Sequence, residues 1–176
     1  MNFEKLLLKG DLRTIGDNNI IVRLVQNQND FDELFKFLFH KNRLVVMRAA
    51  DAVEKITIHS PQYLDKHKSE IFSLSETASN KELQWHFAQF LPRITINENE
   101  FTNAWKILMR WTKDKNNSKI VRVNSMQALF ELNKQNKKFA KDFQKLISEL
   151  EKENIPSIKA RIKKLKGVSG IPAVKS

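Results

Sequence analysis

The sequence predicts an all-α protein built from repeated pairs of helices. One apolar phrase recurs at an interval of 38 residues, as RAADAVEKI at 48–56, HFAQFLPRI at 86–94 and NSMQALFEL at 124–132. The four glycines stand at positions 10, 16, 167 and 170, so the chain contains none from 17 to 166. Tight hairpin turns usually require glycine, and its absence from most of the chain therefore favours helices over strands.

The N-terminal segment is expected to cap the repeats. Residues 3–8 have the pattern of a short amphipathic turn, and residues 17 to about 26 that of a single capping helix. Four further segments, each a first helix of a pair, follow at 31–39, 71–78, 101–109 and 139–147. Asp30 with Glu33, and Asn97 with Glu100, have the spacing of capping boxes that open two of these helices.

The recurring phrase supplies the second helix of each pair. Apolar or small residues occur at i, i+4, i+7, i+8 and i+11 in all three copies, which is one face of an α-helix. The five columns are Val45, Leu83 and Val121; Ala49, Phe87 and Ser125; Ala52, Phe90 and Ala128; Val53, Leu91 and Leu129; Ile56, Ile94 and Leu132. Asn42, Asn80 and Ser118 precede these faces as N-caps, and Pro92 predicts a kink or an early end of the second copy.

At the C-terminal end, Pro156 is expected at the first position of a last helix. Ile158, Ile162 and Leu165 would face inward from that helix. We expect residues 1–29 to form an N-terminal cap, residues 30–166 a repeat array (about 30–60, 65–95, 98–134 and 137–166), and residues 167–176 a disordered tail.

Helix pairs that recur at about forty residues are typical of an α-solenoid, in which neighbouring pairs bury each other's apolar faces. The segment IVRVNSMQAL at 120–129 has Val-Arg, then a small residue, then Ala-Leu, and VVMRAADAV at 45–53 carries its arginine two residues later. The sequence therefore resembles the HEAT and armadillo class, in its small bacterial form, over roughly residues 30–166. The resemblance implies a right-handed α-α superhelix of about four helix pairs plus an N-terminal capping helix.

Composition excludes several classes of function. The chain has no cysteine, which rules out disulfides, thiolate metal sites and a cysteine nucleophile, and is compatible with a reducing cytoplasm. Phosphate-binding loops, dinucleotide fingerprints and serine nucleophile elbows all need glycines that the centre of the chain lacks. The four histidines, at 40, 59, 67 and 86, show no metal-ligand spacing. We expect a cytoplasmic protein with no cofactor, no metal and no membrane partner.

A polar row on the second helices is the main candidate binding site. The resemblance implies that second helices line the concave face of the array, where we expect a protein partner to bind. The row consists of Arg48, Asp51, Lys55, His86, Gln89, Arg93, Asn124, Gln127 and Glu131. A solvated helix face without a ligand is the alternative interpretation of the same residues.

Two sets of cations are candidate anion contacts. Arg43, Lys81 and Lys119 each follow an N-cap, where free amides favour anions, although lysine there is also an ordinary surface residue. Formal charge is +11 overall; residues 134–176 contribute +8, from 12 basic and 4 acidic residues. Within this region Lys159, Arg161, Lys163 and Lys164 could contact nucleic acid. Lysine outnumbers arginine 23 to 8, which genome composition would also explain.

These observations favour a non-enzymatic binding or scaffold module that recognises another protein through the concave face. The alternative is a nucleic-acid-binding protein or a HEAT-like glycosylase of the DNA-alkylation-repair type. That family uses tryptophans and an aspartate on the concave face, and Trp111 and Asp114 lie three residues apart on one helix. Packing is the other interpretation of the tryptophans.

Overall fold

The computed structural model describes residues 2–8 and 18–169, and every regular element within them is a helix. The predicted all-α fold is therefore confirmed. The chain divides into two compact units, unit 1 at Met1–Thr95 and unit 2 at Ile96–Ser176. Asp17, the expected start of the capping helix, and positions 170–176 of the expected tail lie outside the described residues.

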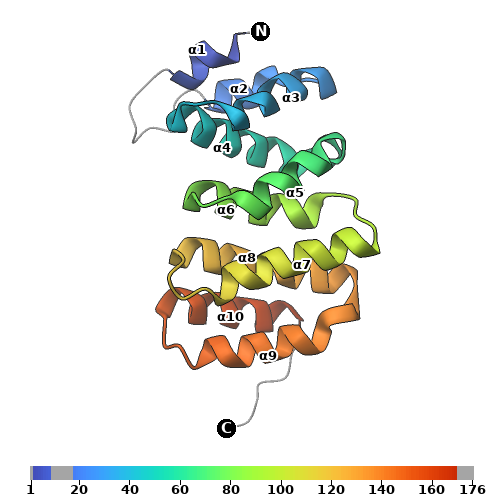
Figure 1. The fold of residues 1–176 in the computed structure, drawn as a ribbon, viewed down its shortest axis with the longest axis vertical. Coiled ribbons are helices and arrows are strands. Elements are labelled where there is room, and N and C mark those ends of the chain that lie inside the picture. Colours follow the sequence, from blue (N-terminus) through green and yellow to red (C-terminus); the bar gives the residue numbers. More distant parts are fainter. Residues whose placement is uncertain (1, 9–17, 170–176) are drawn as a thin grey trace. The chain divides into compact units, whose positions relative to one another are not determined.

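Unit 1 is arranged around α4. Its elements are α1 (Phe3–Leu8), α2 (Asn18–Leu24), α3 (Gln28–Phe35), η1 (Lys36–Phe39), α4 (Arg43–His59), η2 (Pro61–His67), α5 (Lys68–Thr77), α6 (Lys81–Phe90) and η3 (Leu91–Arg93). Helix α4 contacts α1, α2, α3 and α6, while α5 contacts α6 (Figure 1). The first helices α3 and α5 thus each have a second helix, α4 or α6, as a partner.

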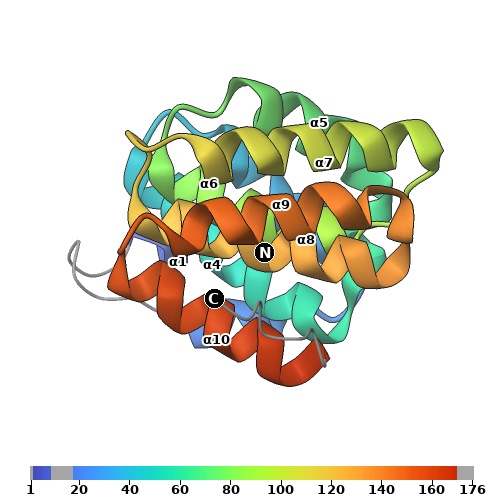
Figure 2. The same cartoon turned by 90° about the horizontal axis from the view of Figure 1, so that it is seen from below.

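Unit 2 repeats the pairing with longer helices. Its elements are α7 (Glu98–Lys113), α8 (Lys119–Gln135), η4 (Lys137–Phe139), α9 (Ala140–Glu151) and α10 (Pro156–Ser169). Helix α8 contacts α7, α9 and α10, and α10 also contacts α9 (Figure 2). Helix α10 begins at Pro156 as predicted and continues through Ser169, into the segment expected to be disordered.

The predicted N-caps of the second helices are confirmed. The Asn42 Oδ1 atom accepts a hydrogen bond from the Leu44 amide, and Asn80 Oδ1 accepts one from the Glu82 amide, both at 2.9 Å. Ser118 caps α8 in the same way. The capping box of Asn97 and Glu100 is also present at the start of α7. These side chains bond backbone amides that have no carbonyl partner inside the helix.

The predicted capping box of Asp30 and Glu33 is wrong. Asn27 is the N-cap of α3, and its Oδ1 atom accepts a hydrogen bond from the Asp30 amide at 3.1 Å. Asp30 Oδ2 in turn accepts from the Gln26 amide at 3.0 Å. The helix therefore begins three residues earlier than predicted, because Asp30 serves as the third helical residue rather than as the cap.

Helix α6 ends early, as Pro92 predicts. The α-helix stops at Phe90 and is followed by a single 3-10 turn at Leu91–Arg93. Proline lacks the amide that would continue the helical bonds, and its ring crowds the preceding turn. The turn keeps Leu91 fully buried and places Arg93 beside α4.

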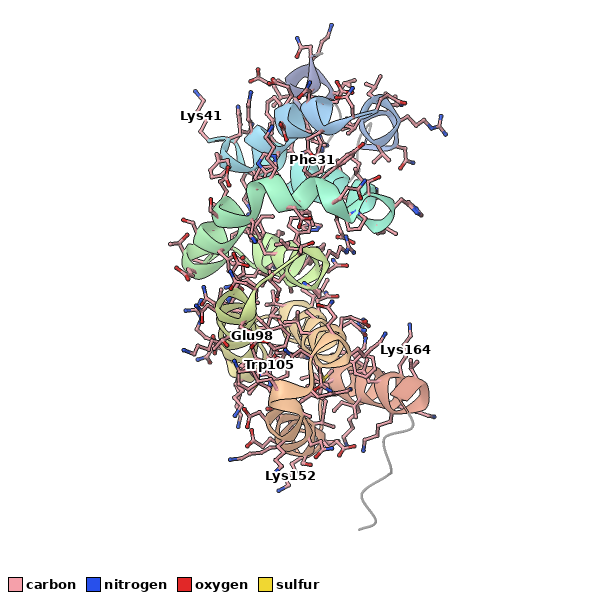
Figure 3. All side chains as sticks on the ribbon, turned by 90° about the vertical axis from the view of Figure 1, so that its right-hand side faces the viewer. Phe31, Lys41, Glu98, Trp105, Lys152 and Lys164 are labelled. Carbon is pink, nitrogen blue, oxygen red and sulfur yellow. The ribbon has the colours of Figure 1, made fainter. Side chains whose placement is uncertain are left out.

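Each unit has its own apolar core. In unit 1 the core includes Phe31, Val45 and Ala49, none of which has exposed surface. In unit 2, Trp105 is buried and its ring lies 5.1 Å from that of Phe139, centroid to centroid. Phe31 and Trp105 both lie among the helices of their own units in Figure 3. The predicted inward-facing residues of α10 are buried as well.

Leu91→Ala should lower the free energy of unfolding by about 2–5 kcal/mol, because it removes a fully buried side chain and leaves a cavity. Ile58→Ala is the matched control, since Ile58 is 55% exposed on α4. Chemical denaturation monitored by circular dichroism would measure both. Equal, small effects of the two substitutions would contradict the assigned helical register.

Candidate functional site

Two members of the predicted polar row are buried in unit 1. Arg48 is 4% exposed, and its Nη1 atom donates to the carbonyl oxygen of Leu7 in α1 at 2.7 Å. His86 is 3% exposed, and its Nδ1 atom lies 2.7 Å from Glu54 Oε2 in α4. Both side chains join neighbouring helices and are not on an open surface.

Arg93 extends the connection between η3 and α4. Its Nη1 atom donates to the Glu54 carbonyl oxygen and to Thr57 Oγ1, both at 2.9 Å. Burial lowers the pKa of Arg93 from its ordinary value, and the Glu54 carboxylate opposes that shift. A guanidinium nevertheless stays charged in proteins, so Arg93 remains a fixed cation between the two elements.

The other row residues of unit 1 remain partly exposed. Asp51 Oδ2 and Lys55 Nζ form an ion pair at 2.8 Å within one turn of α4, and Gln89 is partly exposed on α6. Exposed pairs of this spacing contribute only a few tenths of a kcal/mol to a helix. These three side chains are accessible to a partner at little cost in stability.

In unit 2 one residue of the row, Gln127, is hydrogen-bonded to the last helix. Gln127 Nε2 donates to Glu131 Oε1 at 2.8 Å, and Gln127 Oε1 accepts from Arg161 Nη1 of α10 at 3.0 Å. Asn124 Nδ2 donates to the Ile120 carbonyl at 2.9 Å. All four side chains are partly exposed. We call Asn124, Gln127, Glu131 and Arg161 the α8 polar row.

The cations that follow the N-caps stand where the sequence predicts. Arg43, Lys81 and Lys119 are the first residues of α4, α6 and α8, and all three are exposed. Arg43 Nη2 lies 2.6 Å from Glu82 Oε1 of α6, so this guanidinium is already engaged with a carboxylate. Their role as anion contacts stays a prediction.

Helix α10 presents the predicted basic residues. Lys159, Lys163 and Lys164 are exposed, and no acidic residue occurs between Pro156 and Ser169. Lys164 projects away from the ribbon in Figure 3. Lys166, by contrast, is paired with Glu151 at 2.6 Å. The exposed cations are therefore the three lysines, with Arg161 at their edge.

The sequence interpretation missed two buried polar side chains, Arg122 and Gln84. Arg122 is 2% exposed, and its Nε atom donates to the Thr112 carbonyl at the end of α7, at 2.8 Å. Gln84 occupies the same repeat column and donates to the Ala78 carbonyl at the end of α5, also at 2.8 Å. Both side chains supply donors to helix-end carbonyls. The Val-Arg pair at 121–122 was the signal for this role.

The geometry of Trp111 and Asp114 differs from that of an open base-binding site. Trp111 is 3% exposed, in the core of unit 2, whereas Asp114 is the exposed C-cap of α7. Among the described residues, no group of three or more histidine, aspartate or glutamate side chains could hold a metal ion. No helix in the described ranges is long and apolar enough to cross a membrane.

Comparison with protein families identifies the repeat. The model of a HEAT repeat domain matches residues 6–167. The chain belongs to the HEAT-repeat family. HEAT repeats generally mediate protein interaction and scaffolding. No curated protein and no solved structure matches the chain.

Unit 1 also contains a polar cluster around Asp32 that the sequence periodicity did not predict. His67 Nε2 lies 2.7 Å from Asp32 Oδ1, and Gln28 Nε2 donates to the same oxygen at 2.7 Å. Lys66 pairs with the other carboxylate oxygen. His67 and Lys66 are in η2, a connecting turn outside the repeated apolar phrase, so none of the five apolar columns includes them.

The environment of Asp32 sets its ionisation. Burial by itself would raise the pKa of Asp32, but hydrogen bonds from Lys66, Gln28 and His67 outweigh it and lower the pKa to about 2. The ordinary value is 3.8. Because folding favours the ionised form, the carboxylate stabilises the fold above the unfolded-state pKa and loses this contribution as pH falls through the folded-state value.

The stability difference between the natural protein and Asp32→Asn should therefore shrink between about pH 5 and about pH 2. Chemical denaturation at a series of pH values would measure it. A Lys66→Gln variant should show a higher pKa for Asp32 by carbon-13 NMR titration, because the ammonium donor is removed. A stability difference that is constant over this interval would contradict the assigned contacts.

Proposed function

We propose that the chain is a non-enzymatic binding module that recognises another protein through its second helices. Membership of the HEAT-repeat family over residues 6–167 is the observation that carries this proposal. In the HEAT class the second helices line the concave face. The lack of cysteine is compatible with a cytoplasmic partner.

The α8 polar row supports this proposal with a preorganised set of donors and acceptors. Arg161, Gln127 and Glu131 are held by mutual hydrogen bonds, so their side chains lose less conformational freedom when a partner binds. The row contains one cation, one anion and two amides. This mixture suits the polar rim of a protein interface better than it suits a polyanion.

The burial of Trp111 weighs against the glycosylase alternative. A base-flipping enzyme needs an open pocket in which an aromatic ring can stack on the extruded base. Trp111 is instead 3% exposed and serves the core of unit 2. We therefore favour binding without catalysis.

A photo-crosslinking amino acid placed at Gln127 or Gln89 should capture a protein partner in cells, because both positions are partly exposed on second helices. The same amino acid at Lys106 of α7 and Gln144 of α9, exposed residues of first helices, is the control. Mass spectrometry of the adducts would identify the partner. Capture confined to the control positions would contradict the proposed face.

Nucleic-acid binding is a second candidate function, favoured by the charge of α10. The helix has five basic residues and no acidic one, and Lys159, Lys163 and Lys164 are exposed. Lysines in such a patch can contact phosphates without reading the base sequence. Lys163 and Lys164 are exposed, so their charge can be removed without disturbing the core of unit 2.

Replacing Lys159, Lys163 and Lys164 together by glutamine should weaken binding to a fluorescent DNA duplex. The slope of the logarithm of affinity against the logarithm of salt should fall by about 0.9 for each phosphate that the variant no longer neutralises. The matched control replaces Lys137, Lys141 and Lys145, three exposed lysines of η4 and α9, by glutamine. Fluorescence anisotropy would measure both. Equal weakening by the two triple substitutions would assign binding to net charge rather than to α10.

A further inference from the structure

A hollow on the first-helix side of unit 1 has the shape of a small binding pocket. It lies where α3 and η1 meet η2 and α5, and its volume is about 420 Å³. That volume falls within the range of pockets that bind a small group. The side chains around it include Asp32, Glu33, Phe35, Phe39, His67 and Glu70.

Three rings line one side of the pocket. The Phe35 and His67 rings are stacked, with centroids 4.0 Å apart and planes 16° from parallel. The Phe39 ring follows at 6.3 Å from Phe35, is tilted by 59° against it and is 56% exposed, so Phe39 offers the accessible ring face. An exposed phenylalanine at the edge of a hollow offers an apolar surface to a ligand, whereas the buried Phe35 and His67 keep that surface in place.

With histidine counted as neutral, the formal charge of the pocket lining is negative although the chain is basic. Its lining includes the carboxylates of Asp32, Glu33 and Glu70, against the single lysine Lys36, which pairs with Glu33. Counting Lys66, which pairs with Asp32, still leaves three anions against two lysines. The formal charge of the whole chain, by contrast, is +11.

The Glu70 carboxylate is well placed to accept a further donor. Its side chain is 44% exposed, and its Oε1 atom lies 3.7 Å from His67 Nδ1. Its Oε2 atom accepts a hydrogen bond from Ser69 Oγ at 3.2 Å. Both distances exceed those of a charge-assisted hydrogen bond, so a cationic donor in the pocket would offer this carboxylate a stronger interaction.

A guanidinium group fits both the rings and the carboxylates. It is planar, so it stacks on aromatic faces, and its forked donors match carboxylate oxygens. A lysine ammonium could use the carboxylates but would gain less from stacking on the Phe39 ring. We propose that this pocket binds an arginine side chain of a partner protein, with the guanidinium between the Phe39 ring and the carboxylates of Glu33 and Glu70.

This inference goes beyond the proposed function, because it concerns first helices and specifies the chemistry of the partner residue. The α8 polar row lies in unit 2, on α8 and α10, whereas the pocket lies in unit 1, between α3 and α5. Failure of crosslinking at Gln127 and failure of arginine binding at the pocket are therefore separate results.

The test uses the full chain and a small probe. Isotope-labelled protein is titrated with N-acetyl-arginine amide while amide NMR shifts are recorded, and N-acetyl-citrulline amide serves as the uncharged planar analogue. We expect saturable shifts concentrated at residues 29–39 and 66–70 with the arginine probe, and none with the citrulline probe.

Matched variants locate the binding site. Glu70→Gln should weaken binding of the arginine probe by about tenfold, since it removes a charged hydrogen-bond acceptor. Glu76→Gln is the control, because Glu76 is exposed on the same helix and outside the pocket. Phe39→Ala should also weaken binding of the arginine probe. Because Phe39 is exposed, this substitution should not unfold the protein, so unfolding would not account for the weaker binding.

Three results would overturn the proposal. Equal shifts with the citrulline probe would show that charge is not recognised. Equal effects of Glu70→Gln and Glu76→Gln would show that the pocket is not the site. Self-association in sedimentation velocity that Glu70→Gln abolishes would assign the pocket to a second copy of this chain instead of a different partner.

Discussion

Burial of the second helices is the constraint on which both units depend. Helix α4 presents an apolar face that includes Val45, Ala49 and Val53, and no single neighbour covers it. The helices α1, α2, α3 and α6 contact α4, and α7, α9 and α10 contact α8 in the same manner. In an α-solenoid each pair depends on adjacent pairs for its core. Polar side chains must therefore either reach the edge of these contacts or find a partner inside them.

The repeated apolar face and its caps made most of the helices predictable from the sequence. Caps are local, since Asn42, Asn80 and Asn97 bond amides only two or three residues ahead. The start of α3 was placed wrongly because two residues of the cap-forming type compete there. Asn27 takes the N-cap position, and Asp30 accepts the amide of Gln26, the residue before the cap, so the two side chains together bond amides on both sides of the helix start.

The functional surface was less predictable, because helical periodicity shows which side of a helix is polar but not which neighbouring helices cover that side. Helical periodicity placed Arg48 and His86 on a polar side. In the structure, however, Arg48 bonds the Leu7 carbonyl of α1, and His86 bonds the Glu54 carboxylate of α4. The hollow at α3 likewise depends on His67, which lies 35 residues from its partner Asp32. Such contacts are set by tertiary packing, and the repeat pattern in the sequence does not predict them.

The contact between Arg122 and the turn after α9 has a dynamic consequence. Asn154 takes a left-handed backbone conformation, with φ at 53°, which asparagine tolerates better than most residues. The preceding residue, Glu153, places its carboxylate 2.7 Å from the buried guanidinium of Arg122. Detaching this turn would leave that buried charge without its carboxylate, which is strongly unfavourable. The turn before α10 is thus held to α8, so this turn should stay closed in local openings that separate parts of α10 from the rest of unit 2.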